Sequence, residues 1–169
     1  IYTSDHGDMV GSHGLNQKSW QMLYDETLRV PFIIAGPGIP QGKCAEGLLS
    51  LLDVMPSLAE MCGVEPVADI DGRPFTRAFE GDKAFEGRGY VVAETFQNCH
   101  TGNGQHIDPE EAGETFRTPN IAIRTKKEKY IFHWKDIDEY YDLEKDPYEN
   151  CNTAAGEEAN GRLYEMRSL

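Results

Sequence analysis

Four side chains near the start of the chain have types and spacings that could do chemistry. Asp5 and His6 are adjacent, and His13 and Lys18 follow within thirteen residues of Asp5. A carboxylate oxygen and an imidazole nitrogen are ligands that divalent metal ions accept in proteins. The Lys18 ammonium could bind an anionic oxygen and stabilise charge that develops in a transition state. The His13 imidazole could donate to the same anion or act as a general acid.

Each of these side chains also has a purely structural interpretation. Asp5 could cap the turn that follows it, with His6 packed beside it. A single lysine is most often a solvated surface residue, and His13 could be an ordinary loop histidine. The residue types alone leave both interpretations open.

The elements predicted around these residues place them at the edge of a sheet. Residues 1–4 are mostly β-branched or aromatic, which predicts the end of a strand. In open α/β sheets, loops at the carboxyl ends of strands bind ligands. Three glycines predict a turn-rich loop over residues 7–18. About two helical turns are expected over residues 19–29, followed by a short buried strand over 30–38.

A second helix is predicted over residues 50–64. Asp53 would be its N-cap, Pro56 would lie in its first turn, and Gly63 would end it. Residues 69–89 are polar and rich in glycine, which predicts a linker.

Four strand-like runs and a helix are expected after the linker. The runs are separated by turn residues and lie at 89–95, 120–125, 129–134 and 139–146, with the helix over 157–168. The polar segment 97–119 between the first two runs is long, and long loops in compact domains are often functional. The basic run 124–130 is predicted to be a solvated hairpin.

The composition argues against some classes of function. The 169 residues suffice for one buried core, and a content of 39% hydrophobic and 27% charged residues predicts a folded globular protein. A net charge of −13 disfavours binding to nucleic acids, which requires a basic patch. The four cysteines show neither the CxxC nor the paired-histidine spacing of a zinc site. No apolar run has the length of a membrane span.

The combination of motifs resembles the sulfatase family of the alkaline-phosphatase superfamily. The stretch TSDHGDMVGSHGLNQKSWQMLYDETLRVPFIIAGPG is similar to the family's Ser-Asp-His/Asn-Gly, Gly-His-Gly, spaced Lys, Tyr-Glu and Arg-Val-Pro motifs. The segments LLDVMPSLAEMCGVEP and KYIFHWKDIDEYYDLEKDPYEN resemble later family segments in the same order. The resemblance covers nearly the whole chain.

The resemblance implies roles for the first cluster. Asp5 and His6 would be ligands of a calcium ion, with His6 at a position that is often Asn in relatives. Lys18 would contact the sulfate group as a catalytic and substrate-binding residue, and His13 would be a second catalytic residue. Other matching positions are expected to be structural: Arg29, Asp53, Tyr141, Asp142 and Asp146.

The resemblance also implies an α/β enzyme with a large mixed sheet followed by a smaller antiparallel subdomain. Residues 1–68 would be the C-terminal part of the catalytic domain and would supply an edge of the mixed sheet. Residues 69–89 would be the linker, and residues 90–169 would form a four-stranded antiparallel subdomain with a terminal helix. This chain would therefore be of the α+β type.

Sulfatases use a formylglycine made from the Cys or Ser of a Cys/Ser-x-Pro/Ala-x-Arg motif, and this sequence does not contain that motif. We therefore expect the chain to be the C-terminal part of a longer sulfatase, whose N-terminal part carries the formylglycine and the other calcium ligands. The chain alone is expected to lack sulfatase activity. It is also expected to self-associate through the surface that the remainder would cover.

The expected substrate is a sulfated small molecule or a sulfated glycan. His100 and His106, or Arg117, could face it from the segment 97–119, although each could equally be a surface residue of a loop. Many relatives are exported, which implies a periplasmic or extracellular location, but the sequence itself assigns no compartment. Two alternatives are a phosphonate monoester hydrolase or phosphodiesterase of the same superfamily, and a non-catalytic module that binds anionic sugars.

Overall fold

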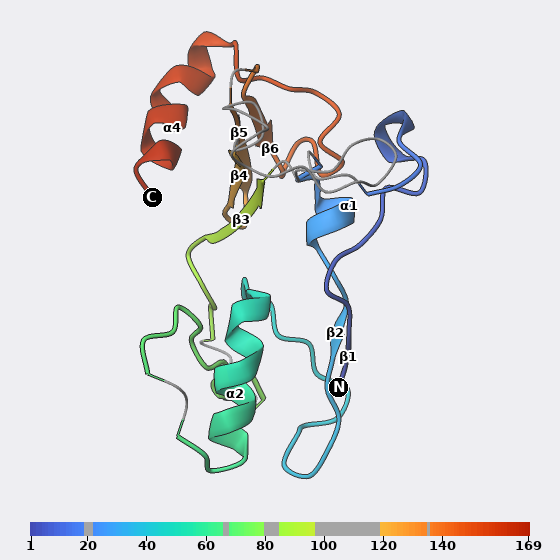
Figure 1. Ribbon diagram of the computed structural model, residues 1–169, viewed down its shortest axis with the longest axis vertical. Helices are drawn as coiled ribbons and strands as arrows, with labels where there is room; N and C mark the ends of the chain where they lie inside the picture. Colours follow the sequence, from blue (N-terminus) through green and yellow to red (C-terminus); the bar gives the residue numbers. More distant parts are fainter. Residues whose placement is uncertain (19–21, 66–67, 80–84, 97–118, 135) are drawn as a thin grey trace, which may run out of the picture. The chain divides into compact units, whose positions relative to one another are not determined.

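The computed structural model describes residues 1–18, 22–65, 68–79, 85–96, 119–134 and 136–169 of the chain. Contacts within the chain divide it into two compact units (Figure 1). Unit 1 comprises residues 1–5 and 31–91, and unit 2 comprises residues 6–30 and 92–169. Residues 6–30 thus group with the C-terminal part of the chain. The domain limits predicted for a longer enzyme stay a prediction.

Unit 1 begins with a short antiparallel strand pair. Strand β1 (Tyr2–Thr3) pairs with β2 (Phe32–Ile33), and Tyr2 lies opposite Ile33. The strands expected at residues 1–4 and 30–38 are therefore present but shorter. Pro31 precedes β2 and a Gly-Pro-Gly turn follows it, and these residues limit the ladder.

The second predicted helix, which lies in unit 1, starts differently from the prediction. A 3-10 helix, η2 (Leu51–Asp53), leads directly into α2 (Val54–Met61). Ser50 is the N-cap, because its hydroxyl accepts from the Leu52 amide while Asp53 accepts from the Ser50 amide. Asp53 stands at the predicted N-cap position of α2, but its side chain makes no capping hydrogen bond to that helix, and Ser50 caps the continuous helical segment instead. Pro56 lies in the first turn of α2 as expected, and Gly63, with φ +66°, follows its end.

The segment predicted as a linker packs onto α2. The Arg73 amide donates to Asp53 at 2.8 Å, and the amide of the buried Phe75 donates to the Ser57 hydroxyl at 2.9 Å. Helix α3 (Thr76–Phe79) follows, and the Arg88 guanidinium forms an ion pair with the buried Asp53. Asp53 therefore joins three parts of unit 1.

We predict that Asp53→Asn lowers the free energy of unfolding of unit 1 by roughly 3 kcal/mol, because Arg88 loses its charged partner. Burial alone would raise the pKa of Asp53, but Arg88 and two backbone amides hold this pKa below its usual value. The stabilisation is therefore present above the unfolded-state pKa of about 4 and lost as the pH falls through the lower folded-state pKa. Urea unfolding at several pH values measures this, with the exposed Asp69→Asn as control. Equal effects of the two substitutions would contradict the prediction.

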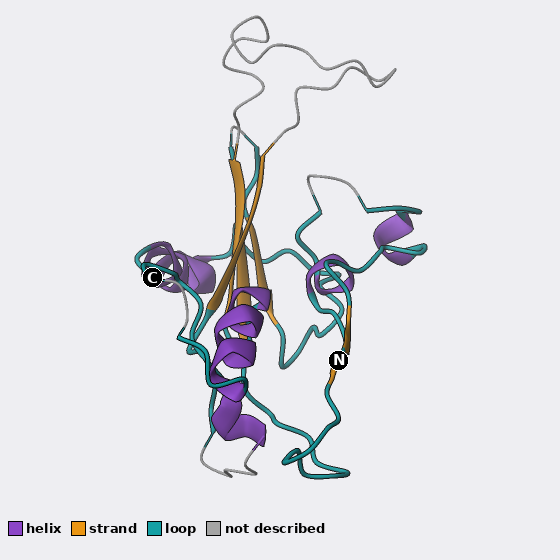
Figure 2. Ribbon diagram, turned by 60° about the horizontal axis from the view of Figure 1, so that its bottom comes forward, coloured by secondary structure: helices purple, strands orange, loops and turns teal. Residues whose placement is uncertain are grey.

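Unit 2 is built on a four-stranded sheet with the strand order β3-β4-β5-β6. Its strands are β3 (Val91–Phe96), β4 (Pro119–Arg124), β5 (Glu128–His133) and β6 (Glu139–Asp142). The β4–β5 and β5–β6 pairs are antiparallel, with Ile121 opposite Phe132 and Tyr130 opposite Tyr140. Figure 2 shows these strands side by side. The predicted antiparallel sheet is confirmed.

The two faces of this sheet have separate cores. Ile131 packs with Leu23, while the next residue along the strand, Tyr130, packs with Leu163 and Met166 of α4 (Glu157–Arg167). This division follows from the alternation of side chains along a strand. The guanidinium of Arg167, in α4, donates to the Tyr130 hydroxyl of β5 at 2.7 Å and so links α4 to this face of the sheet. The predicted terminal helix is confirmed.

The two turns of helix expected over residues 19–29 are reduced to one turn in the described residues, α1 (Asp25–Leu28). The expected turn after β6 is present, since Asp146 accepts from the amides of Asn150 and Cys151 at 3.1 and 2.8 Å. Among the described cysteines, Cys44, Cys62 and Cys151 are free. The described part of the chain contains no helix that is both long and apolar enough to span a membrane.

Candidate functional site

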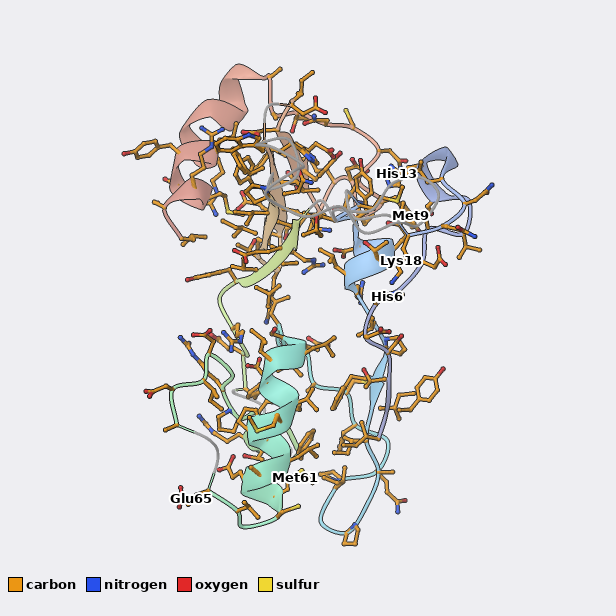
Figure 3. All side chains as sticks on the ribbon, in the orientation of Figure 1. His6, Met9, His13, Lys18, Met61 and Glu65 are labelled. Atoms are coloured by element: carbon orange, nitrogen blue, oxygen red, sulfur yellow. The ribbon has the colours of Figure 1, made fainter. Side chains whose placement is uncertain are left out.

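The segment that leads from β1 to α1 carries the four residues of the first predicted cluster. His6, His13 and Lys18 are labelled in Figure 3, and all three belong to unit 2, whereas Asp5 is an exposed residue of unit 1. The buried side chain of Met9 anchors the segment. A tight turn follows, in which the Ser12 amide donates to the Met9 carbonyl and the Gly11 amide to the Leu15 carbonyl, both at 2.8 Å.

His6 and Lys18 are in direct contact. The Lys18 ammonium lies against Nε2 of His6, and Nδ1 of the same ring lies 2.7 Å from the Gly7 carbonyl oxygen. A carbonyl oxygen can only accept, so Nδ1 carries the ring proton and Nε2 presents its lone pair to the ammonium. The glycine-containing loop therefore folds Lys18 back onto the strand end, as the sequence predicts.

Gly7 holds this pair against α1. Its amide donates to the Thr27 carbonyl at 2.8 Å. A Cβ atom at this position would lie 1.9 Å from the Glu26 carbonyl oxygen, so a residue with a side chain does not fit. The position of His6 therefore depends on the position of α1.

A buried cluster of charges, which we call the α1 anchor, fixes this short helix to the sheet; it consists of Asp25, Arg124, Lys129 and Glu149. The Lys129 ammonium lies 2.6 Å from Asp25 and 2.6 Å from Glu149, and both Lys129 and Glu149 are 0% exposed. The second oxygen of Glu149 accepts from the Asp25 amide at 2.7 Å. Arg124 donates to Asp25 at 2.9 Å. The two cations and two carboxylates balance one another away from water.

The pKa values of the two carboxyl groups in the α1 anchor shift in opposite directions. Burial raises the pKa of Glu149 above its usual value, although Lys129 opposes this shift. Burial also raises the pKa of Asp25, but Arg124 and Lys129 together bring it below its usual value. Asp25 is therefore the firmly ionised member of the cluster.

Lys129 and Arg124 belong to the basic run that was predicted to be a solvated hairpin, and that prediction was wrong for both. Lys129 alternates with Tyr130 along β5 and shares a face with Ile131, which packs in one of the cores. This alternation is the pattern in the sequence that could have indicated a buried lysine. Neither Asp25 nor Glu149 stands out in the sequence as its partner.

His13 contacts a different set of residues. Its imidazole stacks on the Tyr24 ring with 4.1 Å between centroids and 10° between planes. The Tyr24 hydroxyl in turn donates to Glu139 at 3.4 Å, and Glu139 also accepts from Tyr141. Burial, followed by the nearby Glu139 carboxylate, raises the pKa of Tyr24 to about 12, so this hydroxyl stays neutral at pH 7. The structure thus brings Lys18 to His6 and places His13 on Tyr24.

His100, His106 and Arg117 lie outside the described residues. Within the residues described, no group of three or more His, Cys, Asp or Glu side chains could hold a metal ion by itself.

Comparisons with known proteins agree on one family. Residues 11–167 match the family model described as N-sulphoglucosamine sulphohydrolase, C-terminal. The chain is 32% identical over 173 residues to the delta 4,5-hexuronate-2-O-sulfatase of Bacteroides thetaiotaomicron, which covers 100% of this chain and 33% of that protein.

Two solved structures are similar to the whole chain. A 2-O GAG sulfatase superposes with a TM-score of 0.80 at 33% identity, over 99% of this chain and 34% of that one. The phosphonate monoester hydrolase of Agrobacterium radiobacter superposes with a TM-score of 0.78 at 26% identity, over 99% of this chain and 34% of that one. The chain spans about a third of the length of these proteins.

Proposed function

The chain belongs to the sulfatase family, and we propose that it supplies part of an active site that hydrolyses sulfate esters. The contact between Lys18 and His6 carries this proposal, because it joins two residues twelve apart for which the family resemblance implies roles at one site. An ammonium group held at a strand end suits the binding of a sulfate oxygen. There it would stabilise the negative charge that develops on the sulfate during the reaction.

We further propose that Asp5 and His6 are two ligands of a calcium ion. A carboxylate is the kind of oxygen ligand that calcium prefers. The His6 Nδ1–H donates to the Gly7 carbonyl, and metal-binding histidines commonly orient their rings in this way. Calcium takes about six to eight ligands, so the site would need further ligands from outside this pair. A metal ion and the Lys18 ammonium would use the same Nε2 lone pair, so metal binding would free Lys18 for the anion.

The family's formylglycine, where present, supplies the nucleophile for sulfur. This chain's own residues would then have binding and proton-transfer roles. Lys18 would hold the sulfate group, and His13 would protonate the oxygen of the departing alcohol. We propose a sulfated glycan as the substrate class, since two similar proteins are described as a hexuronate-2-O-sulfatase and a 2-O GAG sulfatase.

Phosphonate monoester hydrolysis is the second candidate function, favoured by the superposition on a phosphonate monoester hydrolase over 99% of the chain. Both reactions place negative charge on oxygens around a tetrahedral centre, and a lysine would stabilise either. The two candidates therefore differ in the preferred ester and not in the role of Lys18.

The test compares two esters with the complete gene product that contains this chain. Calcium-dependent release of sulfate from 4-nitrophenyl sulfate, faster than cleavage of a phenylphosphonate ester, supports the first candidate. The reverse preference supports the second. Saturable binding of a sulfated glycan, with cleavage of neither ester and no release of sulfate from that glycan, would identify a non-catalytic module. The 169-residue chain alone is expected to cleave neither ester.

We predict that Lys18→Ala in that gene product lowers kcat about 10²- to 10³-fold, because a cation aimed at the developing charge is lost. KM is expected to change less than kcat. Steady-state kinetics with 4-nitrophenyl sulfate measure both constants, and Lys127→Ala, which removes an exposed lysine of unit 2, is the matched control. An unchanged kcat in Lys18→Ala would remove Lys18 from the chemistry.

A further inference from the structure

The backbone at His13 adopts a conformation that few residues with a side chain adopt. His13 has φ 53° and ψ 20° and stands between Gly11 and Gly14, which also have positive φ values. Histidine is among the residues that tolerate this left-handed region, but the conformation still costs energy unless the surroundings stabilise it. The tight turn and the stacking on Tyr24 are such surroundings. The direction of the imidazole is therefore determined by its contacts.

Glu26 lies at the edge of the same imidazole. Its Oε1 atom is 4.0 Å from Nε2 of His13, and the two side chains are only 24% and 14% exposed. Nε2 of His13 and Oε2 of Glu26 are both buried and have no hydrogen-bond partner among the residues that the structure describes. A buried polar atom that stays unpaired destabilises the folded state. Both groups would be satisfied if the His13 nitrogen donated a hydrogen bond and the Glu26 carboxylate accepted one.

We propose that Glu26 is the positioning residue for His13, with its carboxylate accepting the Nε2 proton directly or through one bridging water molecule. A carboxylate cannot donate, so the nitrogen that faces it must carry the proton. Nδ1 is then the nitrogen that exchanges a proton with the substrate. This assignment rests on the proposed function for the role of His13, whereas the contact between Glu26 and His13 does not.

The proton balance of this arrangement is simple. The imidazolium form of His13 carries protons on both nitrogens, and the positive ring is stabilised by the Glu26 carboxylate. When Nδ1 gives its proton to the oxygen of the departing alcohol, the ring becomes neutral and keeps its Nε2 proton on Glu26. The same division of labour between a carboxylate and an imidazole operates in serine hydrolases.

Tyr24 serves as the platform for the ring. Its hydroxyl is held by Glu139 of β6, and its ring meets the Tyr141 ring edge-on with 6.4 Å between centroids. The stacking holds the plane of the imidazole nearly parallel to the Tyr24 ring. Glu26 is the group that selects the rotation and the protonated nitrogen.

Nuclear magnetic resonance of the complete gene product with labelled histidines tests the contact. We expect the proton bonded to Nε2 of His13 to give a resonance that is shifted downfield, because a proton donated to a carboxylate is deshielded. Burial should also slow the exchange of this proton with water. Glu26→Met should abolish this resonance, and Glu144→Met, which removes an exposed carboxylate of the same unit, should leave it unchanged. Absence of the resonance in the wild type, or its persistence in Glu26→Met, would overturn the proposal.

Glu26→Gln covers the case in which Glu26→Met fails to fold. It keeps the shape of the side chain and removes its charge, so the resonance is expected to move upfield. An unchanged position would count against a carboxylate partner.

Kinetics of the complete gene product separate the positioning role from a structural one. Glu26→Met should lower kcat on the order of tenfold with little change in KM, and should have no further effect in a His13→Ala background. An equal loss in both backgrounds would show that Glu26 does not act through His13. If the gene product cleaves no ester, the proposed function fails, while the resonance experiment still decides on the contact.

Discussion

Lys129→Ala is expected to lower the free energy of unfolding of unit 2 by about 3–5 kcal/mol, because it leaves buried carboxylates without their cation. Lys129 lies 2.6 Å from both Asp25 and Glu149, and neither Lys129 nor Glu149 is exposed to solvent. Lys129 lies against Oε1 of Glu149 and holds the pKa of Glu149 below the value that burial alone would give. Hydrogen exchange of the β5 amides measures the loss, since β5 lies inside the sheet.

The matched control is Lys127→Ala, two residues earlier, in the turn that precedes β5. Lys127 is 68% exposed, and its partner Glu144 is 61% exposed. An exposed pair of this kind contributes less than about 1 kcal/mol. If Lys129→Ala costs no more than Lys127→Ala, the α1 anchor does not stabilise unit 2.

The deficit of Lys129→Ala, that is, the loss of unfolding free energy relative to the wild type, should also depend on pH. Burial raises the pKa of Glu149, so the folded state binds its proton more tightly than the unfolded state does. The contribution of this group to stability is therefore fully present below the unfolded-state pKa and falls as the pH rises through the folded-state pKa. Lys129→Ala removes the cation that opposes this rise in the pKa of Glu149. The deficit should therefore be smaller at about pH 5 than at about pH 8.

Gly7→Ala is expected to destabilise unit 2 by about 3 kcal/mol or more, because the new methyl group meets backbone that cannot yield locally. Its Cβ would lie 1.9 Å from the Glu26 carbonyl oxygen and 3.0 Å from the carbonyl carbon. Separation of Gly7 from α1 would break the hydrogen bond between the Gly7 amide and the Thr27 carbonyl. It would also displace the adjacent His6 from Lys18.

Two measurements check this prediction. Hydrogen exchange of the β5 amides reports the stability of unit 2, and the ring-nitrogen resonances of His6 report its contact with Lys18. Gly161→Ala is the control, since no atom lies within 4 Å of the added Cβ and the residue is inside α4. Alanine in a helix is expected to stabilise by about 0.5–1 kcal/mol there. A Gly7→Ala chain with unchanged exchange and unchanged His6 resonances would contradict the close approach of α1.

Much of the fold could be predicted because its determinants are local. Alternating residues and turn residues indicate the strands of unit 2, and the positions of Pro56 and Gly63 indicate the limits of α2. Asp53 shows where local reasoning failed. A carboxylate near a helix start predicts a cap, but this carboxylate binds Arg88, which lies thirty-five residues later, and Ser50 is the cap. The sequence contains no pattern that pairs two charges at that distance.

Part of the candidate site could likewise be predicted from the sequence, and part could not. The types of Asp5, His6, His13 and Lys18 alone left a structural interpretation open, whereas the combination of motifs along the chain predicted a family, which is confirmed, and a set of roles. The contact of Lys18 with His6 follows from a glycine-containing loop of only twelve residues. The roles themselves stay proposals, to be tested by the experiments above.

The family, the strands of the C-terminal sheet and the segment that carries the candidate site could thus all be predicted from the amino-acid sequence. These properties depend on residues that are neighbours along the chain, where periodicity, turn residues and motif spacing act directly. The three-dimensional fold was needed to show that Lys129 is buried between Asp25 and Glu149, that α1 is held by this cluster, and that Glu26 faces His13. The partners of Lys129 lie as many as 104 residues away, and the burial of a charge depends on what surrounds it in space.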